Sequence, residues 1–350
     1  MKRMFAALLS LALLAALLSG CAGREPVSSG KAGGFSIVAT SFPAYDLARA
    51  VCGQEAEITL LLPPGAESHS YEPTPRDILA VEDCGLFLYL GGESDAWVET
   101  ILSSLDAPAE TLRMIDCVET LEEETLEGMT AQGHSHDDHE DHDDHDAHDD
   151  HDDNDDHDDH DDHDAHDGHG LGEVHEIDKH VWTAPENAGR IARAIARRAA
   201  ELDPGNAEGY LAAADAYQRE IDALDRDFRA FFDTTGEKTL VFGDRFPLRY
   251  FAEAYGLTCY AAFPGCSTQT EPSAATVAFL TEKVREEGIS TVFYIEFSNH
   301  LVADSIAEAA GAETALFHSC HNVSRQDLEA GATYLSLMRG NLETLKRCML

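Results

Sequence analysis

The sequence predicts an α/β protein with two lobes, each built on a mainly parallel sheet flanked by helices, joined by one long rigid helix. Short apolar runs alternate with helical patterns on both sides of a His- and Asp-rich segment. Continuous apolar runs are typical of strands buried on both faces of a parallel sheet. Between the two sets, Asn206–Phe232 is one amphipathic pattern without proline, which would form a rod of about 39 Å.

The first set of elements lies before the His- and Asp-rich segment, in residues 35–205. Apolar runs predict three strands, separated by helical patterns, at Ser36–Thr40, Ile58–Leu62 and Leu86–Leu90. A helix is expected to begin at Pro75, because proline is favoured in a first helical turn. This alternation predicts the N-terminal lobe.

The second set, in residues 234–350, repeats the pattern and predicts the C-terminal lobe. Four strands are expected, at Thr239–Phe242, Cys259–Phe263, Thr291–Ile295 and Thr314–Phe317. Helical patterns lie between them, notably at Ala274–Glu287 and Val302–Ala310. Residues 206–233 are expected to link the lobes as a rod that resists wide hinge closure.

The N-terminus indicates export and lipid attachment. Lys2 and Arg3 precede an apolar run over Phe5–Leu18, which is too short to span a bilayer and predicts a signal peptide over residues 1–20. The run ends in Leu-Ser-Gly before Cys21, which resembles a bacterial lipobox. We expect an extracytoplasmic protein anchored to the cell membrane by a diacylated Cys21 through a polar tether, residues 21–34.

The charge of the chain argues against nucleic acid as a partner. The formal net charge is −42, and it is still −23 without the nineteen acidic residues between Gly133 and Gly170. Nucleic acids are bound by basic patches, which an acidic surface does not supply.

The segment from Gly133 to Gly170 is almost entirely Asp and His, so we expect a disordered loop over residues 133–173. Imidazoles suit Zn²⁺, Ni²⁺ and Cu²⁺, and the carboxylates attract any divalent cation. An acidic spacer without a ligand is the alternative, but His at every second or third position favours metal capture. The expected auxiliary ligands are His134, His136, His139, His142, His145, His148, His151, His157, His160, His163, His166 and His169.

Two further histidines stand where ligands are expected in an α/β fold, beyond the carboxyl ends of strands. His69 lies in the loop after the second strand, and His180 lies directly before a helix. A lone loop histidine is more often a surface residue than a ligand. Both of these sit beside turn-forming residues in a chain that already indicates metal, so both are candidate ligands.

The ordered motifs resemble a known family over essentially all of residues 35–350. They are Ser41-Phe42-Pro43 with Tyr45-Asp46-Leu47, the stretch Leu62–Pro73, His180-Val181-Trp182, and Ala330-Gly331 with Tyr334-Leu335. The chain resembles the zinc/manganese-binding lipoproteins of bacterial metal ABC importers, the cluster A-I solute-binding proteins. A His-rich insertion before the His-Val-Trp motif is similar to the zinc-importing branch.

The resemblance implies four ligands, of which His69 and His180 supply two. The family's third ligand falls at Gly243, which has no donor side chain, so the usual set is incomplete. The fourth, an acidic residue four positions after a strand-ending Glu, falls at His300, whose imidazole suits Zn²⁺. The missing ligand is then water or a group at the cleft mouth, with the candidates Asp244, Glu296, His321 and Cys266.

The remaining cysteines are predicted to lie outside the cytosol, where disulfides are allowed. Seven of the eight are left once Cys21 is lipidated, so at least one is unpaired. We expect Cys266 and Cys320 to form a disulfide, in preference to Cys266 acting as a ligand.

The predicted function is capture of Zn(II), as a transported ligand, between the lobes and its delivery to an ABC permease and its ATPase. The His- and Asp-rich loop would collect metal weakly, and the protein would act as a monomer and not as an enzyme. A surface adhesin or a metal buffer not coupled to transport is one alternative. A secreted zinc hydrolase is another, but the chain has no H-E-x-x-H or other compact ligand motif with an adjacent base.

Overall fold

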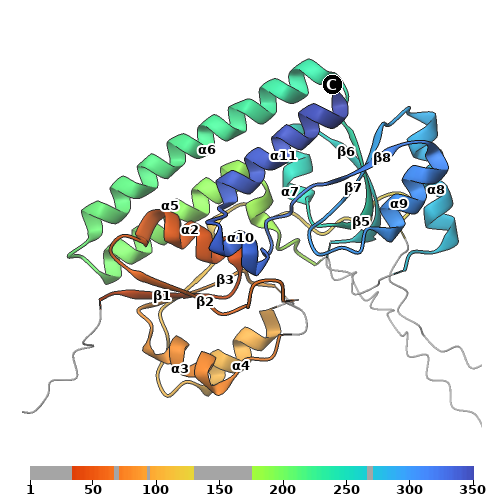
Figure 1. The fold of residues 1–350 in the computed structure, drawn as a ribbon. Helices are drawn as coiled ribbons and strands as arrows, with labels where there is room; N and C mark the ends of the chain where they lie inside the picture. The colour runs from red at the N-terminus through yellow and green to blue at the C-terminus, as the bar shows by residue number, and fades with distance from the viewer. Residues whose placement is uncertain (1–33, 67–70, 93–94, 130–175, 266–270) are drawn as a thin grey trace, which may run out of the picture.

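The computed structural model describes residues 34–66, 71–92, 95–129, 176–265 and 271–350. They form two four-stranded parallel sheets, one in each lobe, with helices against both (Figure 1). This confirms the predicted fold class. Within these ranges no helix combines the length and the apolar character needed to cross a bilayer.

The N-terminal lobe is a sheet with the order β2-β1-β3-β4. Its strands are β1 (Ser36–Ala39), β2 (Glu57–Leu60), β3 (Leu86–Tyr89) and β4 (Thr111–Arg113). Val38 in the centre pairs in parallel register with Thr59 of β2 and Phe87 of β3. Figure 1 shows α3 (Pro75–Asp83) and α4 (Ala96–Ser104) below this sheet, and α2 (Phe42–Cys52) above it.

The C-terminal lobe has a second sheet with the order β6-β5-β7-β8. Its strands are β5 (Thr239–Phe246), β6 (Thr258–Pro264), β7 (Thr291–Tyr294) and β8 (Glu313–Leu316). Its helices are α7 (Arg249–Tyr255), α8 (Ala274–Glu286) and α9 (Leu301–Ala310). The pairing of β5 with β6 shifts register between Phe242 and Arg245, so β5 continues beyond its apolar run into the residues that form the site.

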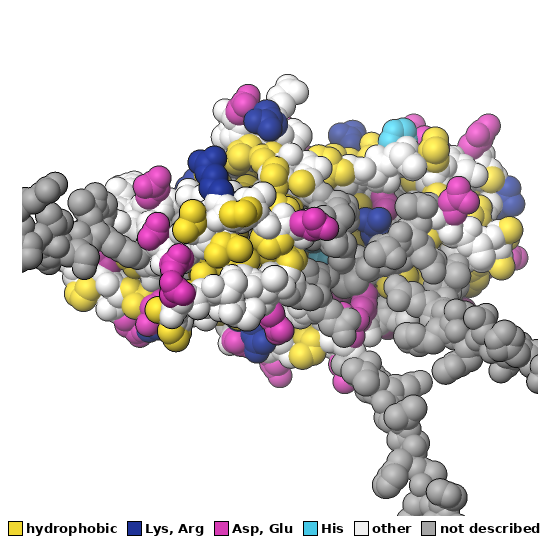
Figure 2. Space-filling model, turned by 90° about the horizontal axis from the view of Figure 1, so that it is seen from below, with side chains coloured by type: hydrophobic (Ala, Val, Ile, Leu, Met, Phe, Trp, Pro, Cys, Tyr) yellow, Lys and Arg dark blue, Asp and Glu magenta, His cyan; other side chains and the backbone are white. Residues whose placement is uncertain are grey.

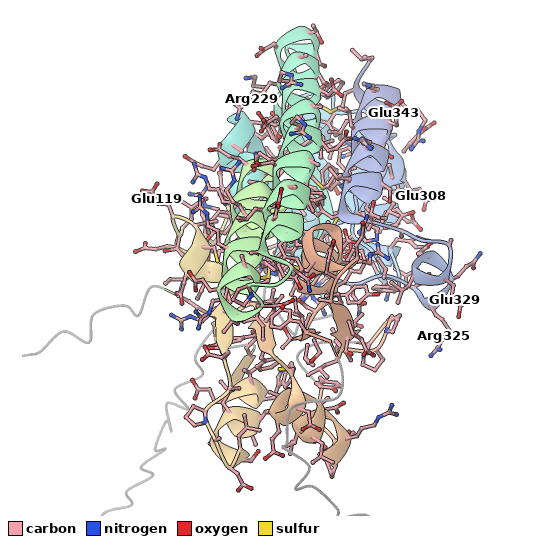
Figure 3. The ribbon with its side chains drawn as sticks, turned by 90° about the vertical axis from the view of Figure 1, so that its left-hand side faces the viewer. Glu119, Arg229, Glu308, Arg325, Glu329 and Glu343 are labelled. Atoms are coloured by element: carbon pink, nitrogen blue, oxygen red, sulfur yellow. The ribbon has the colours of Figure 1, made fainter. Side chains whose placement is uncertain are left out.

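The predicted linking helix corresponds to α6 (Ala207–Thr235), which runs along both lobes and ends at the left-handed Gly236. Two other helices lie beside it, α5 (Pro185–Leu202) and α11 (Tyr334–Met349). Figure 3 shows the three side by side, with Glu343 on the outer side of α11 and Arg229 on the side of α6 that faces α7. The connection is therefore broader than the single rod expected from sequence.

One hydrophobic core continues from the first sheet through these helices into the second lobe. Trp182 and Phe228 belong to the same buried cluster as Phe242 and Phe317 of the C-terminal lobe. Phe317 and Phe228 both pack against Phe251 of α7, with ring centres 5.3 and 5.1 Å from it. A close-packed core shared by both lobes holds the two sheets at a fixed separation.

Three smaller helices complete the described structure. The 3-10 turn η3 (Met114–Cys117) follows β4, and the 3-10 turn η4 (Val181–Thr183) precedes α5. The short helix α10 (Arg325–Glu329) precedes α11. Ser324 caps α10 by accepting a hydrogen bond from the backbone N–H of Asp327. η4 matters for function because it follows His180 directly.

Candidate metal centre

A cavity of about 270 Å³ lies between the lobes at the carboxyl ends of the strands. This is where open parallel sheets bind ligands. Its polar lining comes from both lobes and includes His180, Asp244, Glu296, Ser319, His321 and Asn322.

His180 is buried and oriented by a carboxylate. Its side chain is 2% exposed, and its Nδ1 lies 3.0 Å from Oδ1 of Asp178. The same oxygen accepts the backbone N–H of His180 at 2.7 Å. A ring that donates its Nδ1 hydrogen to a carboxylate keeps a lone pair on Nε2, which is the usual arrangement of a metal-binding histidine. His180 is thus prepared to act as a ligand from the N-terminal lobe.

His321 comes from the C-terminal lobe and meets His180 in the cavity. The two imidazole centres are 5.8 Å apart, at an interplanar angle of 77°. The indole of Trp182 lies against both, with its centre 5.5 Å from His180 and 5.4 Å from His321. Its Nε1 donates to the carbonyl of Ser319 at 2.9 Å. The loop after β8 is therefore fixed to the segment that carries His180.

Asn322 ties the same loop to the N-terminal lobe. Its Nδ2 donates to the carbonyl oxygens of Pro63 and Ala66, at 3.3 and 2.8 Å. Those two residues belong to the loop that leads to His69, which lies outside the described residues. The contact fixes Pro63 and Ala66 against the C-terminal lobe, and Ala66 lines the cavity.

Glu296 organises the loop that carries His321. Its carboxylate, 8% exposed, accepts the backbone N–H of Ser319 at 2.7 Å, the hydroxyl of Ser319 at 2.6 Å and the backbone N–H of His321 at 3.1 Å. A carboxylate offers about four lone-pair sites. These bonds use three of them, and Nδ1 of His318 lies 3.6 Å from Oε2, so Glu296 lines the cavity mainly as the group that holds the loop.

Gly243 has no space for a side chain. A Cβ atom there would lie 2.3 Å from Cα and 2.6 Å from N of Ala303, in the first turn of α9. The neighbouring Asp244 accepts the backbone N–H groups of Arg245 and Ile295, and so ties β5 to β7. The helix backbone thus occupies the space that a ligand side chain at position 243 would need.

These features agree with the comparison of the chain with known proteins. The family described as ZnuA, zinc-uptake complex component A, periplasmic, matches residues 37–348. The chain belongs to this family.

Relatives within the ZnuA family share about a quarter of the residues. The zinc-binding protein AdcA of Streptococcus pyogenes serotype M3 is 26% identical over 323 residues, 92% of this chain and 57% of that protein. The high-affinity zinc uptake system protein ZnuA of Bacillus subtilis strain 168 is 26% identical over 340 residues, 95% of this chain and 94% of that one. The chain spans a little over half the length of the streptococcal relatives.

Solved structures show the same architecture. The Zn(II)-bound ZnuA-like domain of Streptococcus pneumoniae AdcA has a TM-score of 0.66 and 25% identity, covering 91% of this chain and 99% of that one. The laminin-binding protein Lmb of Streptococcus agalactiae has a TM-score of 0.68 at 22% identity, covering 91% and 100%. The second likeness shows the fold alone.

His300, expected to be a ligand, lies apart from the other two histidines of this ZnuA-family chain. It precedes α9 with a left-handed φ of 47° and does not line the cavity. Its Nδ1 is 2.7 Å from Oδ2 of Asp304, its ring lies against Tyr294, and its side chain is 49% exposed. His180, His321 and Glu296 line the same cavity, whereas His300 lies outside it.

Other expected site residues lie outside the described residues: Cys21, His69, Cys266 and the twelve histidines from His134 to His169. The expected Cys266–Cys320 disulfide therefore stays a prediction. Cys320 itself is fully buried, and burial raises the pKa of its thiol well above the ordinary value. A thiol with a raised pKa stays protonated and is a poor metal ligand.

Two residues that shape the site were not foreseen. Asp178 orients His180, and its position two residues before that histidine is a signal that the sequence did contain. Ser319 gives both its backbone N–H and its hydroxyl to Glu296, which no pattern in the sequence predicts.

On the face seen in Figure 2, acidic side chains are more widespread than basic ones. Such a surface raises the local concentration of cations.

Proposed function

We propose that the chain binds Zn(II) in the cleft and delivers it to an ABC permease and its ATPase. The observation that carries the proposal is the pair of imidazoles from opposite lobes, His180 and His321, with centres 5.8 Å apart. Two imidazoles bound to one tetrahedral zinc ion, at about 2.0–2.1 Å from each nitrogen, have ring centres roughly 5 Å apart. A small approach of the rings would let both bind the same ion.

The ion would need further ligands. Within the described ranges, no three His, Cys, Asp or Glu side chains are arranged to hold a metal. We propose His69 as the third ligand, because its loop is attached to the cleft through Asn322. The carboxylate of Glu296, or water, would complete a near-tetrahedral set. His300 is left out of this set because it faces solvent.

The relatives support zinc as the transported ligand. Those in Streptococcus pyogenes and Bacillus subtilis are named for zinc binding and zinc uptake, and the solved Streptococcus pneumoniae domain is Zn(II)-bound. Imidazole ligands also favour zinc over manganese, which prefers oxygen. A binding protein fits the site better than a hydrolase, because Glu296 is held by backbone and hydroxyl groups and is not placed as a free base.

Isothermal titration of the His180→Ala/His321→Ala double variant tests this site. We expect the tight zinc site to disappear while circular dichroism and thermal melting show a folded protein. His300→Ala is a suitable control, since that ring is half exposed and does not line the cavity. Unchanged tight binding in the double variant would refute the site.

We also propose membrane attachment through a lipidated Cys21. Cys21→Ser removes the expected acyl anchor, so the protein should move from the membrane fraction to the soluble fraction. A variant that stays with the membranes would contradict the lipoprotein assignment.

The His- and Asp-rich segment is proposed as an auxiliary, low-affinity collector. Deleting residues 133–170 should lower the number of zinc ions bound per chain and leave one tight site. The composition of this segment predicts disorder, so sharing an ion among its imidazoles would cost ordering entropy, whereas ligands on strand-end loops of the cleft would be preorganised. Chelator competition separates the two classes. Loss of the tight site from a folded deletion variant would make the segment the principal binding site.

A further inference from the structure

We propose that Tyr250, on α7 of the C-terminal lobe, is a positioning residue for the zinc ligand His180, acting through Asp178. The inference rests on the proposed function. It concerns a group that does not touch the metal cavity and belongs to the opposite lobe from the ligand it would position.

The first step is a pair of short segments that run side by side before His180. Glu122 and Ile177 form an antiparallel bridge. The N–H of Glu123 donates to the carbonyl of Glu176 at 2.7 Å, and the N–H of Asp178 donates to the carbonyl of Leu121 at 2.9 Å. We call residues 121–123 and 176–178 the clasp. In the sequence, the two halves of the clasp lie on either side of the His- and Asp-rich segment.

Tyr250 joins both halves of the clasp. Its side chain is 3% exposed, so its hydroxyl must find partners within the protein. The hydroxyl donates to the carbonyl of Asp178 at 2.7 Å and accepts the N–H of Leu121 at 3.0 Å. One phenol thus uses its donor and an acceptor site on two segments that are far apart in sequence.

Asp178 carries this attachment to the ligand. Its backbone carbonyl is held by Tyr250, while its side chain accepts both the backbone N–H and the ring Nδ1 of His180. Tyr250 therefore restrains the backbone of Asp178, and this restraint helps to keep its carboxylate beside the imidazole of His180. Partners of this kind fix the orientation and tautomer of a metal-binding histidine.

His180 is also held from its C-terminal side. The hydroxyl of Tyr334 donates to the carbonyl of Trp182 at 2.9 Å, and the indole of Trp182 donates to Ser319. The Tyr250 hydroxyl thus adds a bond from the C-terminal lobe on the N-terminal side of His180, at the residue whose carboxylate orients the ring. Loss of the Tyr250 hydroxyl should therefore weaken zinc binding as well as the fold.

The test compares two tyrosines of the same helix. Tyr250→Phe removes one oxygen and keeps the packed ring. Tyr255→Phe is the matched control, because that buried hydroxyl donates to Asp225 of α6 at 3.0 Å. Outer partners of metal ligands typically contribute 10–100-fold to affinity. We expect Tyr250→Phe to weaken zinc binding about tenfold and Tyr255→Phe to change it less than about twofold, at similar losses of melting temperature.

Two further readouts separate positioning from simple stabilisation. With Co(II) in place of Zn(II), the visible absorption of the bound metal should change in Tyr250→Phe and stay unchanged in Tyr255→Phe. In a double-mutant cycle, Tyr250→Phe should add little to Asp178→Asn, since both act on the same imidazole.

The outcomes are distinguishable from those that test the site itself. Equal zinc affinity and an equal Co(II) spectrum in the two tyrosine variants would overturn the positioning role. So would full additivity in the cycle. A tight site that survives loss of both His180 and His321 would instead overturn the proposed function on which the inference rests.

Discussion

His180 and His300 are both oriented by a carboxylate through Nδ1, but they lie in different surroundings. The distances are similar, 3.0 Å to Asp178 and 2.7 Å to Asp304. His180 is almost completely buried and lies beside a second imidazole, whereas His300 is half exposed. An oriented imidazole becomes a metal site when other donors converge on the same point.

Burial also changes the strength of the two pairs. An exposed ion pair contributes little because water and salt screen it. A buried hydrogen bond to a carboxylate is stronger, and the ring it holds does not have to be ordered when the metal arrives. The Asp178–His180 pair should therefore control zinc affinity, and the Asp304–His300 pair should not.

The largest difference is expected when the two imidazoles are removed one at a time. His180→Ala should weaken tight zinc binding more than about a hundredfold, since even outer partners of a ligand contribute 10–100-fold. His300→Ala should change it less than about threefold. Chelator competition measures both. A large loss in His300→Ala would place that residue among the ligands and break the comparison.

A smaller difference is expected from the carboxylates. Asp178→Asn keeps the shape of the side chain but removes the charge that favours Nδ1–H, and should cost 10–100-fold in zinc affinity. Asp304→Asn is its matched control and should leave the affinity unchanged within about twofold. Equal effects of the two variants would show that the orienting carboxylate of His180 has no special role.

A substitution at Gly243 tests whether a side chain fits at the position where the resemblance places a third ligand. Gly243→Ala places a methyl group against the backbone of Ala303, at the helix that begins after His300. The backbone must shift, and overpacking of this kind costs about 1–3 kcal/mol of unfolding free energy. Denaturant unfolding measures the loss, with Gly340→Ala as the control, because a Cβ there meets nothing within 4 Å and its φ, like that of Gly243, is not left-handed. An unchanged stability would show that a side chain fits at position 243.

The smallest effect concerns the pH dependence of the exposed pair. The hydrogen bond from His300 lowers the pKa of Asp304. A carboxyl with a lowered pKa in the fold contributes stability above its unfolded pKa of about 3.9, and this is lost as the pH falls further. Wild type and Asp304→Asn should thus differ slightly in unfolding free energy at neutral pH and converge below about pH 4. Convergence at higher pH would contradict the lowered pKa.

Much of the fold follows from local sequence. Runs such as Leu86–Leu90 identify buried strands, and the observed strands begin and end close to these runs, except β5, which continues past Phe242 to Phe246. β4 was missed because Thr111–Arg113 has only three residues and ends in a charge. The broad helical connection was missed because the packing of α5 and α11 along α6 depends on contacts that no single helical pattern shows.

The site was predictable only in part. His180 lies in a motif and lines the cavity, while His321 was one of several open candidates. The spacing that favoured His300 does not specify the direction of its side chain. That direction depends on left-handed backbone angles at Phe297 and His300, which turn the chain just before α9. Such angles are uncommon for residues other than glycine and cannot be inferred from spacing.

The indole of Trp182, which lies against both His180 and His321, gives the protein an internal fluorophore at the cleft. The chain has only two tryptophans, and the other, Trp97, lies against Tyr71 in the N-terminal lobe. Trp97→Phe would leave Trp182 as the only source of indole emission. A change in that emission on adding metal would then report occupancy and release in real time, without a dye or a label.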